Sequence, residues 1–201
     1  MKNILTTIGV ALTLFVATNL QAQDASKALK QGEKAKDFTL KNAKGESIRL
    51  YNLLEKGAVV LTWYRGGWCP YCNVALQKLQ DELPQIKKQG ATLVALTPEF
   101  PDYSLTTKEK NKLQFEVLTD VNNNVARSYG VVFTLDSKTT KRYEEDLQLS
   151  LHNGTNSSEL PIPATYIIDK NGIIRYAYVN PDYKQRADAK VVVQELKKLS
   201  N

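Results

Sequence analysis

The two cysteines, Cys69 and Cys72, are the residues best suited to chemistry. They stand in the segment Trp68-Cys69-Pro70-Tyr71-Cys72, and the 201-residue chain contains no others. A bridge between them closes a very short loop and restrains little of the unfolded chain, so the pair is a poor structural staple. On a helix the two sulfurs lie one turn apart, which lets one react and the other resolve a mixed disulfide or a sulfenic acid. The spacing therefore predicts a thiol redox site.

The neighbouring residues predict different roles for the two sulfurs. Pro70 suits the first position of a helix, where its missing N–H would have no partner in any case. Cys69 then lies at the helix N-terminus, where unpaired N–H groups and the helix dipole favour a thiolate. We expect a lowered pKa at Cys69, with Cys69 attacking and Cys72 resolving.

Other uses of the pair are less consistent with the sequence. A structural zinc site needs about four ligands, and the chain offers two cysteines and one histidine, His152. Haem attachment needs histidine after the second cysteine, where Asn73 stands. His152 lies alone in a loop-like stretch, which favours a surface histidine over a catalytic base and disfavours a Cys-His protease. We predict no metal and no cofactor, while an inert pair or a structural clip stays open.

The elements that must position the cysteines can be read from hydrophobic periodicity. The apolar run 58–63 predicts a central strand buried on both faces, and residues 70–89 have helical spacing with a kink at Pro84. The remaining expected strands are 38–40, 47–50, 92–96, 115–118, 165–168 and 173–179, and the remaining helices are 104–112 (capped by Ser104), 124–129 and 188–199. This order predicts an α/β fold with a mixed sheet, and it places both cysteines where a buried strand meets a helix.

The chain divides into an N-terminal leader and one domain. Residues 1–22 combine a positive start, an apolar run and a small residue at a plausible cleavage point, which predicts a signal peptide. We therefore expect an exported protein, periplasmic or extracellular, with no stable membrane association after cleavage. Residues 23–36 read as a flexible lead-in and 37–201 as the domain, within which 133–160 reads as an inserted loop with one short helix.

Composition is that of an ordinary globular protein, with 42% hydrophobic and 24% charged residues. The net charge of +6 comes from lysines and arginines scattered along the chain rather than gathered in a stripe with aromatic residues. We therefore predict a solvated basic surface and no nucleic-acid partner.

A second signal is Pro163, which directly precedes the expected strand 165–168. Redox folds of this kind place a cis peptide at such a position, opposite the cysteines. We expect a cis Ile162–Pro163 bond, and the alternative is an ordinary trans proline.

Three segments resemble the peroxiredoxin-like branch of the alkyl hydroperoxide reductase/thiol-specific antioxidant (AhpC/TSA) family. They are Trp63-Tyr64-Arg65-Gly66-Gly67-Trp68-Cys69-Pro70-Tyr71-Cys72-Asn73, Pro161-Ile162-Pro163-Ala164-Thr165-Tyr166-Ile167-Ile168-Asp169 and Asn180-Pro181-Asp182-Tyr183-Lys184-Gln185-Arg186. The resemblance covers most of the chain from about Lys34 onward.

The resemblance implies a thioredoxin fold, with a central mixed sheet flanked by helices on both faces. It also implies that Cys69 reduces hydrogen peroxide or an organic hydroperoxide and becomes a sulfenic acid, which Cys72 resolves. An external thiol reductant, thioredoxin-like or another dithiol donor, would reset the disulfide. The supporting residues of such a site would be Arg65, Gly66, Trp68, Pro163 and Arg186.

The sequence departs from the family pattern at three places. The family carries Thr or Ser three residues before the reactive cysteine and Pro seven before, where this chain has Gly66 and Thr62. The family also carries an arginine near the position of Pro163, which Arg65 or Arg186 would have to replace unless both are surface or structural arginines.

Two other functions therefore stay open. The cysteine pair also fits a thioredoxin-like thiol:disulfide oxidoreductase acting on exported protein disulfides, and Cys-Pro-Tyr-Cys by itself matches the glutaredoxin active site. A thioredoxin-fold binding module with an idle cysteine pair is the non-enzymatic alternative.

Overall fold

A computed structural model describes residues 25–155 and 157–199 of the chain. The predicted signal peptide, 1–22, lies outside the described residues.

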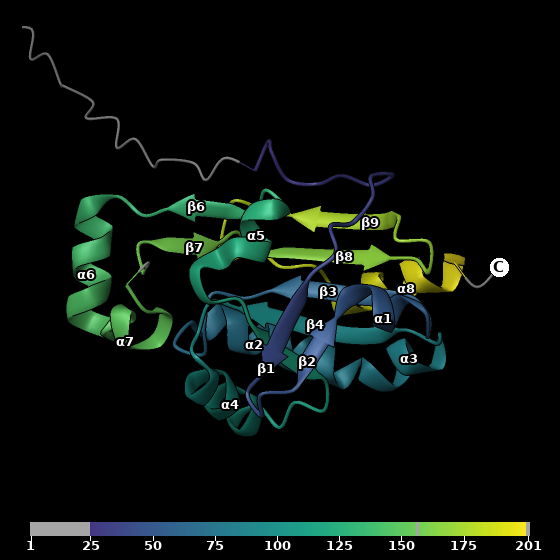
Figure 1. The fold of residues 1–201 in the computed structure, drawn as a ribbon, viewed down its shortest axis with the longest axis horizontal. Coiled ribbons are helices and arrows are strands. Elements are labelled where there is room, and N and C mark those ends of the chain that lie inside the picture. The colour runs from purple at the N-terminus through teal and green to yellow at the C-terminus, as the bar shows by residue number, and fades with distance from the viewer. Residues whose placement is uncertain (1–24, 156, 200–201) are drawn as a thin grey trace, which may run out of the picture.

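A seven-stranded sheet forms the centre of the molecule, in the order β2-β1-β5-β4-β3-β8-β9 (Figure 1). Its strands are β1 (Thr39–Asn42), β2 (Ser47–Arg49), β3 (Val59–Trp63), β4 (Thr92–Thr97), β5 (Glu116–Thr119), β8 (Ala164–Ile168) and β9 (Ile174–Val179). Strand β3 runs parallel to β4 and antiparallel to β8, so the sheet is mixed. Every residue of β3 is buried, as expected for a strand covered on both faces.

Helices cover both faces of this sheet, as the family resemblance implies. Side chains of α1 (Leu50–Leu54) and α5 (Asn124–Ser128) share one hydrophobic cluster with Leu61 and Trp63. On the other face, α2 (Pro70–Asp81), α3 (Leu83–Lys88) and α8 (Ala189–Leu199) pack over Val60 and Ile167. Helix α4 (Pro101–Lys110) follows β4, and the short 3-10 turn η1 (Val121–Asn123) follows β5.

Two helix boundaries differ from the expected ones. The predicted helix 70–89 is broken at Glu82 into α2 and α3, and Pro84 lies in the first turn of α3, where a proline is tolerated. Helix α4 begins at Pro101, so Ser104 lies inside it and donates to the Pro101 carbonyl instead of capping the helix.

The region 133–160, expected to be a loop with one short helix, is largely regular. It contains β6 (Val132–Thr134), α6 (Ser137–Leu147), α7 (Leu149–Asn153) and β7 (Glu159–Pro161), and β6 pairs antiparallel with β7. Asp136 caps α6 by accepting from the Thr139 N–H. No residue of α6 is fully buried, and its apolar side consists of Tyr143 and Leu147 alone. Figure 1 shows this insertion at one end of the molecule.

The described part of the expected flexible lead-in, residues 25–36, is packed against the domain. Ala28 and Ala35 are buried, and the Leu29 N–H donates to the Tyr129 carbonyl over 3.0 Å. The prediction of a flexible lead-in is wrong because two small residues among its many lysines, Ala28 and Ala35, contact the core.

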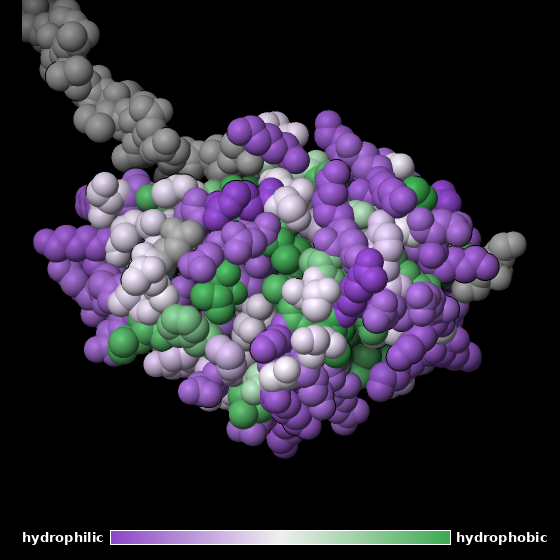
Figure 2. Space-filling view, viewed as in Figure 1, coloured by the Kyte–Doolittle hydropathy of each residue, from purple (hydrophilic) through white to green (hydrophobic). Residues whose placement is uncertain are grey.

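The face seen in Figure 2 is mainly hydrophilic, with apolar residues in small separate groups. None of the helices in the described part of the chain combines the length and the apolar composition that crossing a bilayer requires.

Candidate active site

The cysteines lie where β3 gives way to α2. Helix α2 begins at Pro70, as predicted, and Cys69 is its extended N-cap residue. The Cys69 N–H donates to the Gly66 carbonyl over 3.1 Å, and the Cys69 carbonyl accepts from the Cys72 N–H over 3.0 Å. These bonds place both sulfurs at the first turn of the helix.

Both cysteines are free thiols buried below the surface. Cys69 exposes 3% of its surface and Cys72 none, and the two side chains are hydrogen-bonded to each other. The bond to Cys72, together with burial, raises the pKa of the Cys69 thiol. Burial by itself also raises the pKa of Cys72, but the Cys69 hydrogen bond, the charge of Arg186 and the Arg65 backbone N–H together lower it to about 6.

The expected lowering of the pKa at Cys69 is therefore wrong. The thiol–thiol hydrogen bond and the charge of Arg186 favour a thiolate at Cys72 over one at Cys69. The helix dipole acts on both sulfurs of the first turn, so hydrogen bonds and the nearest cation decide between them. At neutral pH the reduced pair carries one negative charge in total.

Arg186 approaches Cys72 from the segment between β9 and α8. Its Nη2 lies 3.3 Å from the Cys72 sulfur. Its Nη1 donates to the carbonyls of Tyr183 and Gln185, so the guanidinium is oriented by its own loop. The sequence singled out this arginine, and the structure brings it to Cys72.

Arg65 is held in a cage of three aromatic rings. Its guanidinium carbon lies 5.0 Å from the ring centre of Trp68, 4.5 Å from that of Tyr183 and 5.7 Å from that of Tyr143. Its Nη2 donates to the Tyr143 hydroxyl over 3.1 Å. The side chain is buried, and its charge favours the thiolate of Cys69. Tyr143 belongs to α6, so the insertion reaches the cysteine site, and sequence patterns held no signal for this contact.

Two of the three departures from the family pattern, Gly66 and Thr62, have local explanations. A Cβ on Gly66 would lie 2.1 Å from Trp68 Nε1, and the Gly66 φ is +152°, so neither Thr nor Ser fits there while Trp68 keeps its place. Thr62 Oγ1 donates to the Ala164 carbonyl over 3.1 Å and lies 2.9 Å from Thr165 Oγ1, so Thr62 joins β3 to β8.

Glu99, which the sequence analysis missed, anchors the loop before Cys69. The carboxylate is buried and accepts the Gly67 N–H over 2.9 Å. His152 Nδ1 lies 3.7 Å from it, and the His152 ring lies 4.1 Å from the Tyr103 ring centre to centre. His152 is therefore half-buried rather than a surface histidine, and it lies beside the carboxylate that accepts the Gly67 N–H.

The Ile162–Pro163 peptide is trans, so the expected cis bond is wrong. The chain runs extended from β7 to β8 through these two residues. The Ile162 N–H donates to the Val131 carbonyl over 2.8 Å, and the Pro163 carbonyl accepts from the Asn180 N–H over 3.2 Å. Backbone hydrogen bonds on both sides keep this segment extended, whereas cis prolines occur typically in tight turns. Pro163 itself is buried beside the end of β3, since Ala164 pairs with Trp63.

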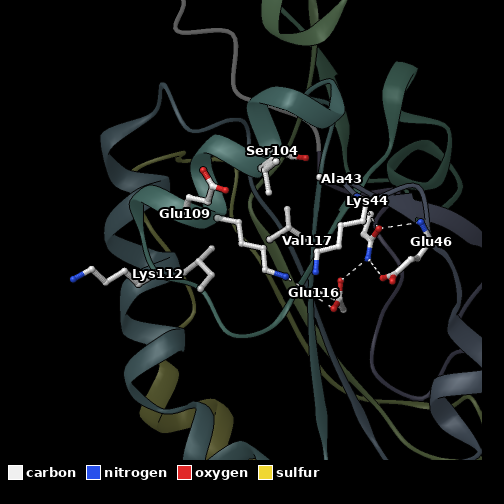
Figure 3. Close-up of a pocket in the computed structure, with 12 residues that line it drawn as sticks. Ala43, Lys44, Glu46, Ser104, Glu109, Lys112, Glu116 and Val117 are labelled. Atoms are coloured by element: carbon white, nitrogen blue, oxygen red, sulfur yellow. Dashed lines mark hydrogen bonds and ion pairs between the residues drawn. The ribbon is translucent and has the colours of Figure 1, made fainter.

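A separate cavity of about 240 Å³ lies between the β1–β2 turn, α4 and β5 (Figure 3). Its wall carries charges of both signs, among them Lys44, Lys108 and Glu116, and Lys108 Nζ lies 4.0 Å from a Glu116 oxygen. No residue of the predicted site lines it.

Comparison with known proteins gives the relationship of the chain. The AhpC/TSA family model matches residues 31–177. The chain is 29% identical over 151 residues to a chloroplastic peroxiredoxin Q of Oryza sativa subsp. japonica, covering 75% of this chain and 59% of that protein. It is 32% identical over 130 residues to the thiol-disulfide oxidoreductase ResA of Halalkalibacterium halodurans, covering 64% of this chain and 72% of that protein. The chain thus spans about three fifths of the rice relative.

Solved structures agree in fold. The crystal structure of peroxidoxin BcpB from Mycobacterium tuberculosis superposes with a TM-score of 0.69 at 21% identity, over 85% of this chain and 98% of that one. Peroxiredoxin Q of Xanthomonas campestris superposes with a TM-score of 0.65 at 15% identity, over 82% of this chain and 92% of that one. The sheet and helices are those of a thioredoxin-like fold, and since the family model spans most of the domain, the chain belongs to the AhpC/TSA family.

Proposed function

We propose that the protein is a thiol peroxidase that reduces hydrogen peroxide or organic hydroperoxides at Cys69. The observation that carries the proposal is the hydrogen-bonded thiol pair at the start of α2, with the caged Arg65 charge acting on Cys69. Family membership and the peroxiredoxin relatives support the same reaction. Both sulfurs are buried, which favours a small substrate.

In the first step, the Cys69 sulfur attacks the terminal oxygen of the peroxide and the O–O bond breaks. The Cys69 proton passes along the thiol–thiol hydrogen bond to Cys72, which returns it to the departing alkoxide. The products are a Cys69 sulfenic acid and an alcohol, or water when the substrate is hydrogen peroxide. Arg65 stabilises the negative charge that develops on the reacting oxygens.

In the second step, the Cys72 thiolate attacks the sulfur of the sulfenic acid. The Cys69–Cys72 disulfide forms, and hydroxide leaves and takes a proton from solvent. With a pKa of about 6, Cys72 is ionised at neutral pH and needs no further activation. The low pKa that the sequence predicted for the attacking sulfur, Cys69, thus belongs to the resolving sulfur, Cys72.

An external dithiol donor then returns the pair to the reduced state. We further propose that the protein works after export, because residues 1–22 have the composition of a signal peptide. Disulfide chemistry is suited to an oxidising compartment.

Stopped-flow oxidation tests the proposal. We expect the reduced protein to react with hydrogen peroxide much faster than a free thiolate does, and Cys69→Ser to abolish the reaction. Cys72→Ser is the matched control, because it should form a sulfenic acid that dimedone traps, with no disulfide. A wild-type rate equal to that of a free thiolate defeats the proposal.

The second candidate function is thiol:disulfide exchange with protein substrates. The similarity to ResA favours it. The trans Ile162–Pro163 bond counts against it, because a thioredoxin-type disulfide reductase site has a cis proline opposite its cysteines. Reduction of insulin disulfides that depends on Cys69, without fast peroxide turnover, would decide for this candidate.

A further inference from the structure

Arg186 contacts the resolving sulfur rather than the attacking one. Its Nη2 lies 3.3 Å from Cys72, and Nη1 is occupied by two carbonyls of its own loop. The position of the Arg186 guanidinium is therefore set by the backbone of residues 183–186 and by the Cys72 sulfur together. A guanidinium placed this way interacts with the charge state of Cys72.

The charges around the pair are unbalanced. Within residues 25–155 and 157–199, neither Arg65 nor Arg186 is paired with a carboxylate, and the Nε atom of each is buried without a hydrogen-bond partner. In the reduced pair the Cys72 thiolate faces Arg186 and Cys69 faces Arg65, whereas a disulfide carries no charge. Arg186 therefore stabilises the reduced state and loses that interaction on oxidation, which makes the disulfide a stronger oxidant.

We propose that Arg186 poises the Cys69–Cys72 disulfide as an oxidant of dithiols, by holding Cys72 as the leaving thiolate. The inference rests on the proposed function in one respect, since peroxide supplies the disulfide. It extends that function by assigning the second half of the cycle to Arg186 and the first half to Arg65.

The exchange reaction is balanced as follows. A thiolate of the donor attacks Cys69 Sγ, the Cys69–Cys72 bond breaks, and its electron pair goes to Cys72 Sγ beside Arg186. The second donor thiol then attacks the mixed disulfide and releases Cys69, which takes one proton, and a second proton goes to solvent. The donor loses two electrons and becomes a disulfide, and the pair gains them. A leaving thiol of low pKa departs faster, so Arg186 accelerates this step as well as favouring it.

Several elements contribute the groups that face Cys72. Cys69 comes from the start of α2, the Arg65 backbone N–H from the preceding loop, and Arg186 from the segment before α8. Tyr64, at the end of β3, is also within electrostatic range, and burial and the charge of Glu99 keep it neutral by raising its pKa. Among these groups Arg186 is the cation in contact with the sulfur.

The decisive measurement is the equilibrium of the pair with glutathione at pH 7. We expect Arg186→Met to lower the equilibrium constant for reduction severalfold and by no more than about tenfold, the limit that corresponds to about 30 mV. Arg186→Lys should recover part of this change. Arg175→Met is the matched control, because Arg175 lies on β9 and pairs with Asp169 over 2.6 Å, and its constant should equal that of the wild type. A folded Arg186→Met protein with the wild-type constant would overturn the inference.

The wild-type protein supplies a test that needs no variant. Reduction consumes two protons below the pKa of Cys72 and one above it. Two glutathione thiols supply two protons, so the equilibrium constant should not change with pH below about pH 6, where the pKa of Cys72 lies, and should rise tenfold per pH unit above it. An equilibrium constant that stays independent of pH up to pH 8 would overturn the inference.

The two proposals fail separately. Slow peroxide oxidation combined with the expected shift in Arg186→Met would remove the peroxidase function and keep the oxidising disulfide. Fast peroxide oxidation combined with an unchanged equilibrium constant in Arg186→Met would keep the peroxidase function and remove the role of Arg186. The rate of reduction by dithiothreitol, a small dithiol probe, should fall in Arg186→Met in parallel with the equilibrium constant.

Discussion

Gly66 stands where the family carries a hydroxyl residue, and Trp68 occupies the space that a side chain would need. We predict that Gly66→Ala destabilises the protein more than Gly45→Ala does. Both glycines have positive φ, +152° and +82°, but a Cβ on Gly45 meets nothing within 4 Å. Gly45→Ala should cost about 1 kcal/mol through backbone strain, and Gly66→Ala at least about 1 kcal/mol more through the contact with Trp68.

Urea unfolding monitored by tryptophan fluorescence measures both changes. Gly45→Ala serves as the control for backbone strain alone. Equal losses in the two variants would show that Trp68 moves aside freely and that the space at position 66 is not limiting.

The pair of cysteines also shows how far residue types predict chemistry. Their spacing predicts two sulfurs on one turn of a helix, and both lie there. The site of the charge depends on Arg186, which follows Cys72 by 114 positions in sequence, and on the direction of one thiol–thiol hydrogen bond. No local pattern carries that information.

At the scale of elements, the insertion is joined to the site by one side chain of α6. We predict that Tyr143→Phe slows the reaction with hydrogen peroxide by roughly fivefold, since a hydrogen bond to a charged group contributes about 1 kcal/mol or more. Tyr143→Ala should slow it further, because the cation–π contact with Arg65 and the edge contact with Trp68 are also lost.

Lys138→Ala is the matched control on the same helix, because Lys138 is exposed. Its peroxide rate should equal that of the wild type. The rate should fall in Tyr143→Phe while the melting temperature stays near that of Lys138→Ala, since a general loosening of α6 would lower both. An unchanged rate in Tyr143→Ala would mean that Arg65 needs no support from the insertion.

Elements with a strong hydrophobic pattern were predicted well, and those without one were not. The run 58–63 corresponds to β3 (Val59–Trp63), and the last helix corresponds to α8 (Ala189–Leu199). Helix α6 buries none of its residues fully, and it is stabilised by its Asp136 cap and by contacts that lie far away in sequence. Its apolar side holds only Tyr143 and Leu147, so charged residues rather than a hydrophobic run carry its pattern.

For the whole molecule, the redox state of the pair is linked to stability and pH. In the reduced folded protein the pKa of Cys72 is lowered to about 6 from the ordinary value of 9.0. Between these values the unfolded chain binds one proton more, so the free energy of unfolding rises with pH, on the order of 1 kcal/mol per unit. This stabilisation is lost as the pH falls through about 6.

Above pH 9 the free energy of unfolding falls as the pH rises. The reason is that the pKa of Cys69 is raised in the fold, so Cys69 stays protonated while the thiols of the unfolded chain ionise. We therefore predict that the reduced protein gains stability relative to the disulfide form from pH 6 to about pH 9 and then loses it. Denaturant unfolding of both forms across this range measures the difference, and the disulfide form is the control because it has no titrating thiol. A difference independent of pH would contradict the shared proton.

Sequence alone determined the type of site and the layers around it. A cysteine pair one turn apart, a proline that starts the helix and a buried strand before it are local features, and local features set local structure. Hydrophobic periodicity likewise determined the α/β fold with a mixed sheet, because burial of apolar side chains is the main driving force of folding. The family resemblance added the helices on both faces.

Tertiary structure decided which groups act on the two sulfurs. The Arg65 cage includes a tyrosine 78 positions away, the anchor of the active-site loop is a glutamate 32 positions away, and the trans Pro163 follows from backbone partners on both sides. Electrostatic interactions and hydrogen bonds act through space, so residues far apart in sequence determine which sulfur holds the proton and which one carries the charge.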